Sequence, residues 1–308
     1  MAKAKEITGL DCEANVLDWA DKILRVRFGE ILEKRETALH SESIEGVHDM
    51  RVATRRLRSA LRDFSPLLKK KPLNKLKKDL KQIADALGAA RDQDVAIIAL
   101  EKLRKKSRVE NIKNGIAELI EQRCALREQA NIGLLEMLSA TTLKDLQKRF
   151  DRTVDEAVKH QKTAVSFNEA GRDVIGKSLK EFCALSDHIY EPFIDESLHE
   201  LRIAAKRLRY AIELYTACWG KQIEPFAEKA AEMQNFLGEV HDADAWLESL
   251  SESLRNGDDN RANIWLLSEF VEKRTKNYRA ALKLWSDWKN TDFIGRLQAI
   301  IGQTNVGG

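Results

Sequence analysis

Apolar residues recur every three or four positions along most of the chain, which is the spacing of amphipathic α-helices. No alternating pattern of the kind that half-buried strands show competes with it. Prolines and glycines interrupt the pattern at Pro66, Pro72, Pro192, Gly220 and Gly257, where helices are expected to end or begin. The pattern therefore predicts an all-α protein with helices at 14–39, 44–68, 73–104, 109–138, 143–159, 169–189, 195–217, 223–254, 261–287 and 292–301.

One unit of this pattern occurs twice. The segment VHDMRVATRRLR at 47–58 matches LHELRIAAKRLR at 198–209. The match continues with LGAARDQD at 87–94 and LGEVHDAD at 237–244, and with LIEQR at 119–123 and FVEKR at 270–274. An offset of 150 or 151 residues is too long for a solenoid repeat and leaves room for about four helices. We therefore predict an N-terminal tail at 1–10 and one domain at 11–308, made of two four-helix bundles, repeat 1 at 11–160 and repeat 2 at 165–308.

Each copy places basic residues on one face of a helix. At 100° per residue, the first set shares an arc of roughly 80° along about 21 Å of helix, opposite the apolar face. This set consists of His48, Arg51, Arg55, Arg58 and Arg62. The second set consists of His199, Arg202, Lys206 and Arg209. Glu213 stands where the first copy has Arg62, so the second set is one charge shorter.

The charge of the chain is concentrated around the first set. The formal net charge is only +3. Between residues 48 and 81 there are twelve basic and three acidic residues, a local balance of +9, so the rest of the chain carries −6. A concentrated basic patch on a nearly neutral protein indicates a local site for an anion.

Several like charges in line on one helix are unfavourable unless an anion compensates them. Arginine suits phosphate because its planar guanidinium forms bidentate hydrogen bonds and stays charged. His48 and His199 would add donors whose charge depends on pH. The alternative is an ordinary solvated helix face or one that is ion-paired to neighbouring helices.

The two His-x-x-Arg-x-x-x-[Arg/Lys]-Arg-Leu-Arg cassettes and the two Leu-Gly-x-x-[Arg/His]-Asp-x-Asp segments resemble the CHAD domain, the conserved histidine α-helical domain. The resemblance extends from about residue 11 to the end of the chain. It implies two four-helix bundles related by pseudo-twofold symmetry around a basic groove or pore. It also implies binding of inorganic polyphosphate rather than catalysis. Such domains often accompany CYTH-type triphosphate-processing domains, for which this chain has no room, so we expect a stand-alone member.

The resemblance implies that the two basic sets are the polyphosphate ligands. Further candidates for the same site are Arg56, Arg207, Arg123, Arg274, Lys78, Lys81, Arg91 and His241. For Arg123 and Arg274 the alternative is a structural salt bridge with Asp92, Asp242 or another acid. Carboxylates would repel phosphate, so we expect the paired acids to orient arginines rather than to bind; they are Asp92, Asp94, Asp242 and Asp244.

A metal-dependent phosphohydrolase of the HD type is a first alternative, because His48-Asp49 and His241-Asp242 are His-Asp dyads. The corresponding positions hold His199-Glu200 and Arg91-Asp92, and arginine is not a metal ligand. Metal storage by histidines and acids is another alternative. No P-loop, Gly-rich phosphate loop or helical His-Glu-x-x-His is present. We predict no catalytic residue, no metal ligand and no cofactor.

Nucleic acid is the closest rival ligand, since a basic face alone does not distinguish it from polyphosphate. No nucleic-acid-binding motif stands out, and few aromatic residues lie among the basic ones to stack on bases. A scaffold that docks an acidic protein is a third possibility. It would need one outer patch instead of two similar faces.

The remaining features concern the compartment. No apolar run approaches 18 residues, and the N-terminus has no apolar segment typical of a signal peptide. The four cysteines are scattered without a CxxC motif and are typical of free thiols in a reducing compartment. We expect a cytoplasmic protein at polyphosphate granules, with polyphosphate-metabolising enzymes as partners and no membrane association. The oligomeric state stays open.

Overall fold

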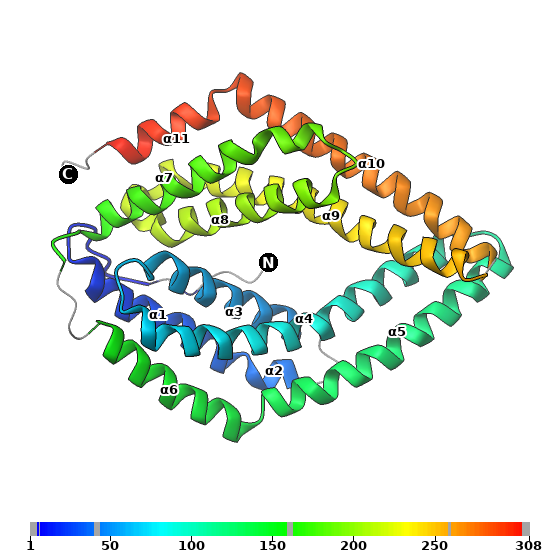
Figure 1. The fold of residues 1–308 in the computed structure, drawn as a ribbon, viewed down its shortest axis with the longest axis horizontal. Coiled ribbons are helices and arrows are strands. Elements are labelled where there is room, and N and C mark those ends of the chain that lie inside the picture. Colours follow the sequence, from blue (N-terminus) through cyan, green and yellow to red (C-terminus); the bar gives the residue numbers. More distant parts are fainter. Residues whose placement is uncertain (1–4, 6, 40–43, 159–162, 258–259, 304–308) are drawn as a thin grey trace. The chain divides into compact units, whose positions relative to one another are not determined.

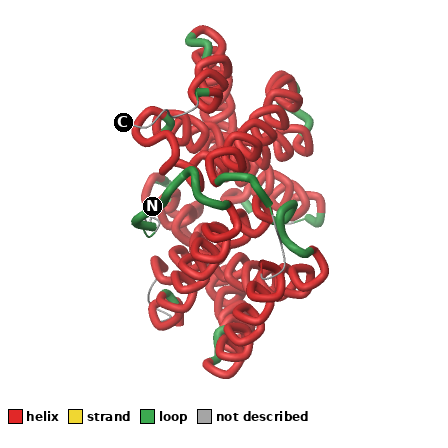
Figure 2. The backbone as a smooth tube through the Cα atoms, turned by 90° about the vertical axis from the view of Figure 1, so that its left-hand side faces the viewer, coloured by secondary structure: helices red, strands yellow, loops and turns green. Residues whose placement is uncertain are grey.

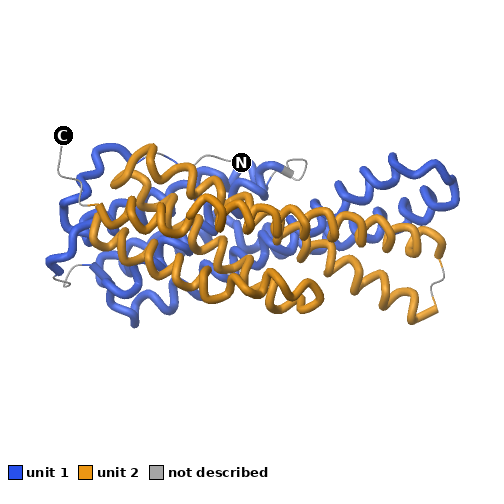
Figure 3. The backbone as a smooth tube through the Cα atoms, turned by 90° about the horizontal axis from the view of Figure 1, so that it is seen from above, with its two compact units in different colours: residues 1–167 blue, residues 168–308 orange. Residues whose placement is uncertain are grey.

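A computed structural model describes the chain except for residues 1–4, 6, 40–43, 159–162, 258–259 and 304–308. Within the described residues the backbone forms eleven α-helices and two short 3₁₀-helices. Outside these helices, the same residues pair as β-structure only in an isolated bridge between Asn15 and Ser166 (Figure 2). The predicted all-α class is confirmed. The chain divides into two compact units, unit 1 at residues 1–167 and unit 2 at residues 168–308 (Figure 3). The repeats at 11–160 and 165–308, and their pseudo-twofold arrangement, stay predictions.

The helices of unit 1 follow the predicted ones with three differences. They are α1 (Val16–Glu33), α2 (Arg35–Leu39), α3 (Ile44–Phe64), α4 (Lys70–Lys106), α5 (Glu110–Met137) and α6 (Ala140–Val158) (Figure 1). The predicted helix at 14–39 is divided at Lys34, whose amide donates to the carbonyls of Ile31 and Leu32. α3 ends before Ser65, because the ring of Pro66 disfavours helical geometry in the preceding residue. α4 begins before Pro72, because proline is tolerated in the first turn, where its missing N–H leaves no bond unmade.

The helices of unit 2 also agree with the sequence pattern. They are α7 (Phe167–Leu185), the 3₁₀-helix η1 (Ser186–Tyr190), α8 (Asp195–Trp219), the 3₁₀-helix η2 (Gly220–Gln222), α9 (Glu224–Arg255), α10 (Arg261–Asn290) and α11 (Phe293–Gly302). The predicted helix at 169–189 tightens into 3₁₀ geometry at Ser186. Residue 159 of the predicted helix at 143–159 lies outside the described residues.

In unit 1, α3 packs against α1, α2 and α4, and α4 continues beyond the bundle as a long hairpin with α5 (Figure 1). α6 closes the bundle against α1 and α4. The stacked rings of Phe28 and Phe150, with centroids 4.1 Å apart, join α1 to α6. The apolar side of α3 is fully buried at Leu57, Leu61 and Phe64. This anchoring leaves the other side of α3 for polar residues.

The central helices of unit 2 are arranged like those of unit 1. α8 packs on α9, α9 forms a hairpin with α10, and α11 folds back on α10. α7 contributes Phe182, whose ring lies 5.2 Å from the ring of Trp288, and Trp288 stacks on Phe293 at 3.9 Å. The close approach of α7 to α8 occurs at Gly171, beside Tyr215.

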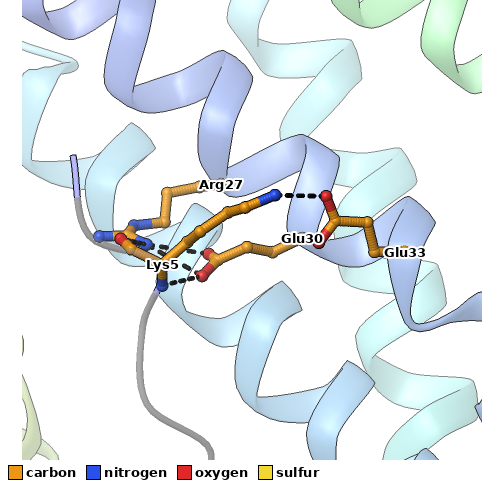
Figure 4. A network of polar contacts seen from close by, with 4 residues as sticks. All are labelled: Lys5, Arg27, Glu30 and Glu33. Atoms are coloured by element: carbon orange, nitrogen blue, oxygen red, sulfur yellow. Dashed lines mark hydrogen bonds and ion pairs between the residues drawn. The ribbon is translucent and has the colours of Figure 1, made fainter. Parts of the chain in front are cut away.

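The described part of the predicted tail at 1–10 is bound to α1 (Figure 4). The amide of Lys5 donates to the Glu30 carboxylate at 2.6 Å, and its side chain forms an ion pair with Glu33. Arg27 donates to the Lys5 carbonyl at 3.0 Å. Residues 1–4 and 6 lie outside the described residues.

Replacing Gly171 by alanine should destabilise unit 2. The added Cβ would lie 2.7 Å from the ring of Tyr215, which is fully buried and cannot move aside freely. We expect a loss of about 1–3 kcal/mol in the free energy of unfolding, measured by urea denaturation. Gly176→Ala on the same helix is the control, because its Cβ would meet nothing within 4 Å. That variant should gain up to about 1 kcal/mol from helix propensity. Equal unfolding midpoints for the two variants would contradict the packing.

Candidate anion-binding site

The basic residues of the first cassette lie along the surface of α3 and are called here the α3 face: His48, Arg51, Arg55, Arg58 and Arg62. Arg58 is exposed, and the others are partly buried. Arg51 lies 3.9 Å from the carboxylate of Asp92 on α4. Arg62 binds the buried carboxylate of Asp63 at 2.7 Å. The α3 face therefore carries more cations than anions along its length.

His48 lies at the N-terminal end of the α3 face, called here its head, next to Arg91 of α4. Burial lowers the pKa of His48, and the positive charges of Arg91 and Arg55 lower it further. The charges of Glu45 and Asp49 oppose this effect without cancelling it. The imidazole is therefore partly buried, and the largest charge effect on it comes from the fixed positive charge of Arg91.

The second cassette forms the α8 face, which consists of His199, Arg202, Lys206 and Arg209. The ring of His199 lies 4.6 Å from that of His241 on α9, and its Nδ1 lies 3.4 Å from Nη2 of Arg202. Burial lowers the pKa of His199, and Arg202, His241 and Lys206 lower it further. The first copy has Arg91 in the position of His241. Both units therefore bring a cationic or titratable side chain from the following helix to the head of the face.

The two faces differ at their far ends. Arg209 is only 6 % exposed, because its Nε donates to Glu213 at 2.6 Å and its Nη1 to Gln234 at 3.5 Å. The corresponding residue of the first copy, Arg58, is exposed. Glu213 in place of Arg62 thus removes a positive charge, and its ion pair with Arg209 keeps that side chain buried within unit 2.

The additional candidates fall into two groups. Arg207 is ion-paired with Glu181, and Arg274 is ion-paired with Asp244 and lies 3.5 Å from Asp195. Arg274 therefore lies in a structural salt bridge, which is the alternative that the sequence analysis gave for it. The remaining candidates are placed at partly buried or exposed positions of α3, α4 and α5: Arg56, Arg123, Arg91, Lys78 and Lys81. Burial lowers the pKa of Arg123.

The sequence comparison missed one charged residue that forms a buried ion pair. Arg127 binds Asp94 at 2.7 Å across the α4–α5 hairpin, with side chains only 13 % and 6 % exposed. Asp244 and Arg274 form the corresponding pair in the α9–α10 hairpin. The sequence match had aligned Arg123 with Arg274, one helical turn away. Two arginines one turn apart were visible in the sequence, but only the packing of the hairpin selects between them.

The paired acids lie beside arginines. Asp92 approaches Arg51, and Asp94 and Asp244 hold the hairpin arginines. Across the described part of the chain, no three His, Cys, Asp or Glu side chains are grouped so that they could hold a metal ion. Among the same residues, no helix combines the length and apolar character needed to cross a membrane.

Arg91→Gln should raise the pKa of His48, because it removes the largest charge effect that lowers it. An NMR pH titration of the ring protons measures this, with His199 in unit 2 as an internal control. Both pKa values should lie below the ordinary value of about 6.5 in the wild type. The unfolded chain then binds more protons than the folded one in the interval between the lowered values and 6.5. The free energy of unfolding should therefore fall as the pH falls through this interval. Ring pKa values at or above 6.5 would contradict the positive environment.

Arg127→Ala should destabilise unit 1 by about 3–5 kcal/mol, because it leaves the buried Asp94 carboxylate without its cation. The double variant Asp94→Ala, Arg127→Ala should recover part of this loss. Arg123→Ala is the matched control one turn away and should cost less. Urea denaturation measures all three, and equal losses for the two arginines would contradict the assigned pair.

The chain is similar in sequence to known proteins. Residues 22–251 match the sequence profile of the CHAD domain. Two proteins of Mycobacterium tuberculosis, uncharacterized protein Rv2226 (strain ATCC 25618 / H37Rv) and uncharacterized protein MT2285 (strain CDC 1551 / Oshkosh), are 29 % and 28 % identical over 222 residues. These regions cover 68 % of the chain and 40 % of each relative, so the chain spans about two fifths of their length.

Two solved structures share the fold. The crystal structure of the CHAD domain from the plant Ricinus communis matches with a TM-score of 0.72 and 22 % identity, over 92 % of this chain and 95 % of that one. PptA from Streptomyces chartreusis matches with a TM-score of 0.69 and 16 % identity, over 89 % and 100 %. At these identities the likeness shows the fold alone. The sequence profile covers most of the chain, and the chain belongs to the CHAD domain family.

Proposed function

We propose that the chain binds inorganic polyphosphate along the α3 face and the α8 face. The observation that carries the proposal is the environment of the two histidines. In each unit, burial lowers the histidine pKa most, and cations on the same helix together with a basic side chain on the next helix lower it further. A bound polyanion would relieve this repulsion and favour the protonated imidazole. Membership of the CHAD family and the resemblance of both cassettes support the same ligand.

Polyphosphate matches the faces in charge and in shape. It is a linear chain with about one negative charge per phosphate, spaced more densely than the roughly 3.4 Å per strand of DNA. A row of arginines on one helix face can contact successive phosphates of such a chain. Affinity should come mainly from charge neutralisation and release of counterions, so it should fall steeply with salt.

The proposal assigns binding and no catalysis. The dyad His48-Asp49 has no counterpart in unit 2, where His199 is followed by Glu200. Next to His48, Arg91 occupies the position that His241 holds in unit 2. A fixed cation there would repel a metal ion. Polyphosphate binding in the cytoplasm would place the protein at polyphosphate granules and give it polyphosphate-metabolising enzymes as neighbours.

One observation favours single-stranded nucleic acid as a competing ligand. Tyr190 and Phe193 are exposed by 53 % and 90 % just before α8 begins. Tyr278 and Arg274 of α10 donate to the carbonyls of Ile189 and Pro192, which holds this segment in place. Exposed aromatic rings near a basic helix can stack on bases.

Arg51→Glu combined with Arg202→Glu should abolish polyphosphate binding without unfolding the helices. Both residues lie at the head of their faces, and each reversal places a negative charge beside the ligand. A titration with long-chain polyphosphate at ~150 mM salt, in competition with single- and double-stranded DNA at matched phosphate concentration, measures the effect.

The matched control reverses two exposed arginines elsewhere, Arg152 on α6 and Arg279 on α10. It changes the net charge equally and should retain most of the affinity. Undiminished binding by an Arg51→Glu, Arg202→Glu protein that is still helical by circular dichroism would exclude the α3 and α8 faces. Equal affinity for polyphosphate and both forms of DNA would instead favour a general cationic surface.

A further inference from the structure

We infer that unit 1 carries a second row of cations on α4, and that the α3 face and this row together bind an extended polyphosphate chain over a length that unit 2 cannot match. The row consists of Lys77, Lys81 and Arg91 and is called here the α4 row. The inference rests on the proposed function. It adds Lys77 to the ligands and predicts a preference of unit 1 for long chains.

The α4 row lies on one side of its helix. At 100° per residue, Lys77 and Lys81 fall about 40° and 80° from Arg91. The two positions between them on the same side are Ala84 and Gly88, which have little or no side chain. A Cβ added to Gly88 would meet no atom within 4 Å. The middle of the row is therefore open to a ligand.

Contacts at both ends place the α4 row beside the α3 face. At one end, Lys77 donates to the hydroxyl of Ser65 at 2.8 Å, immediately after α3. At the other end, Arg91 lies close enough to His48 for its charge to lower the histidine pKa. Because α3 and α4 are antiparallel neighbours, the α3 face and the α4 row run side by side between these contacts.

Three of the acids near the α4 row have arginine neighbours, and Asp85, which is exposed one turn after Lys81, offsets only part of the charge of the row. Asp63 is buried and paired with Arg62, and Asp79 is paired with Arg149 of α6 at 3.1 Å. Asp92 approaches Arg51 at the head of the face. At the opposite end, burial and the charge of Lys70 lower the pKa of Lys77. Lys77 is therefore partly buried near another cation, and a bound anion would reduce the repulsion between the two.

The length of the rows sets the size of the ligand. Lys77 and Arg91 are fourteen residues apart, as are His48 and Arg62, which corresponds to about 21 Å of helix. At the ~3.4 Å per phosphate of a DNA strand, this length holds about six phosphates, and more in the denser polyphosphate. Phosphates could be contacted from both rows at once.

Unit 2 lacks the second row. At the repeat offset of 150, Ala227 and Ala231 stand where unit 1 has Lys77 and Lys81. Arg209 is buried against Glu213, so the accessible cations of the α8 face end at Lys206. From His199 to Lys206 the helix rises about 10 Å, enough for roughly three phosphates at the DNA spacing. A short phosphate chain can therefore use either unit, whereas a long one gains additional contacts only in unit 1.

The test compares Lys77→Ala, Lys81→Ala with Lys71→Ala, Lys75→Ala in the full chain. The first pair introduces the residues that unit 2 has, and the control removes the same charge from two exposed lysines of α4 that fall about 80° and 120° beyond Lys81 on the helix. Isothermal titration with polyphosphate of ~100 phosphates and with tripolyphosphate, at several salt concentrations, gives the affinities. Loss of two phosphate contacts should lower the long-chain affinity about tenfold and the salt slope by about 1.4, with less than about a threefold effect on tripolyphosphate.

The control pair should change each affinity by less than about threefold, because its lysines lie outside the arc of the α4 row. Equal losses in the two variants would overturn the α4 row while leaving the proposed function intact. Equal losses for long polyphosphate and tripolyphosphate would overturn the length preference. A wild-type protein that binds neither probe would overturn the proposed function together with this inference. Circular dichroism confirms that each variant is still helical.

Discussion

The structure depends on two opposing effects in α3 and α8: repulsion between like charges on one side of each helix and burial of apolar side chains on the other. Like charges in line on a helix cost a few tenths of a kcal/mol per pair at the surface. Burial of a leucine or phenylalanine contributes about 1.5–3 kcal/mol. Leu57, Leu61 and Phe64 are fully buried on the opposite side of α3, as are Leu208 and Tyr215 on α8. The burial of the apolar sides therefore outweighs the repulsion between the cations on the polar side of each helix.

A separate set of charges stabilises the long hairpins. Arg127 with Asp94, and Arg274 with Asp244, pair facing helices away from bulk water. Since their charges are satisfied within the hairpin, these arginines have a different role from those of the α3 face. Pairs of this kind occupy acids inside the hairpins, so a chain with nearly equal numbers of acids and bases can still carry an excess of cations along α3.

The two copies of the repeat have become chemically unequal. His241 stands where the first copy has Arg91, so the basic side chain beside the leading histidine differs between the two units. Glu213 buries Arg209, and alanines replace two lysines of the α4 row. Each change shortens or weakens the basic surface of unit 2. In the proposed function, a long polyanion would therefore be bound mainly by unit 1, and unit 2 would add a shorter contact.

The sequence by itself determined the helices and the two basic faces, because these follow from periodicities within 20 to 30 neighbouring residues and from prolines that end helices locally. It also showed that the segments at 47–58 and 87–94 recur about 150 residues later. It did not determine the break at Lys34, the burial of Arg209 or the choice of Arg127 over Arg123. It also did not determine which lysines of α4 lie beside α3. These features depend on contacts between helices that are far apart in the chain, such as Arg127 with Asp94 at a separation of 33 residues. One helical turn changes the partner of a side chain without changing the hydrophobic pattern, so only the tertiary packing decides them.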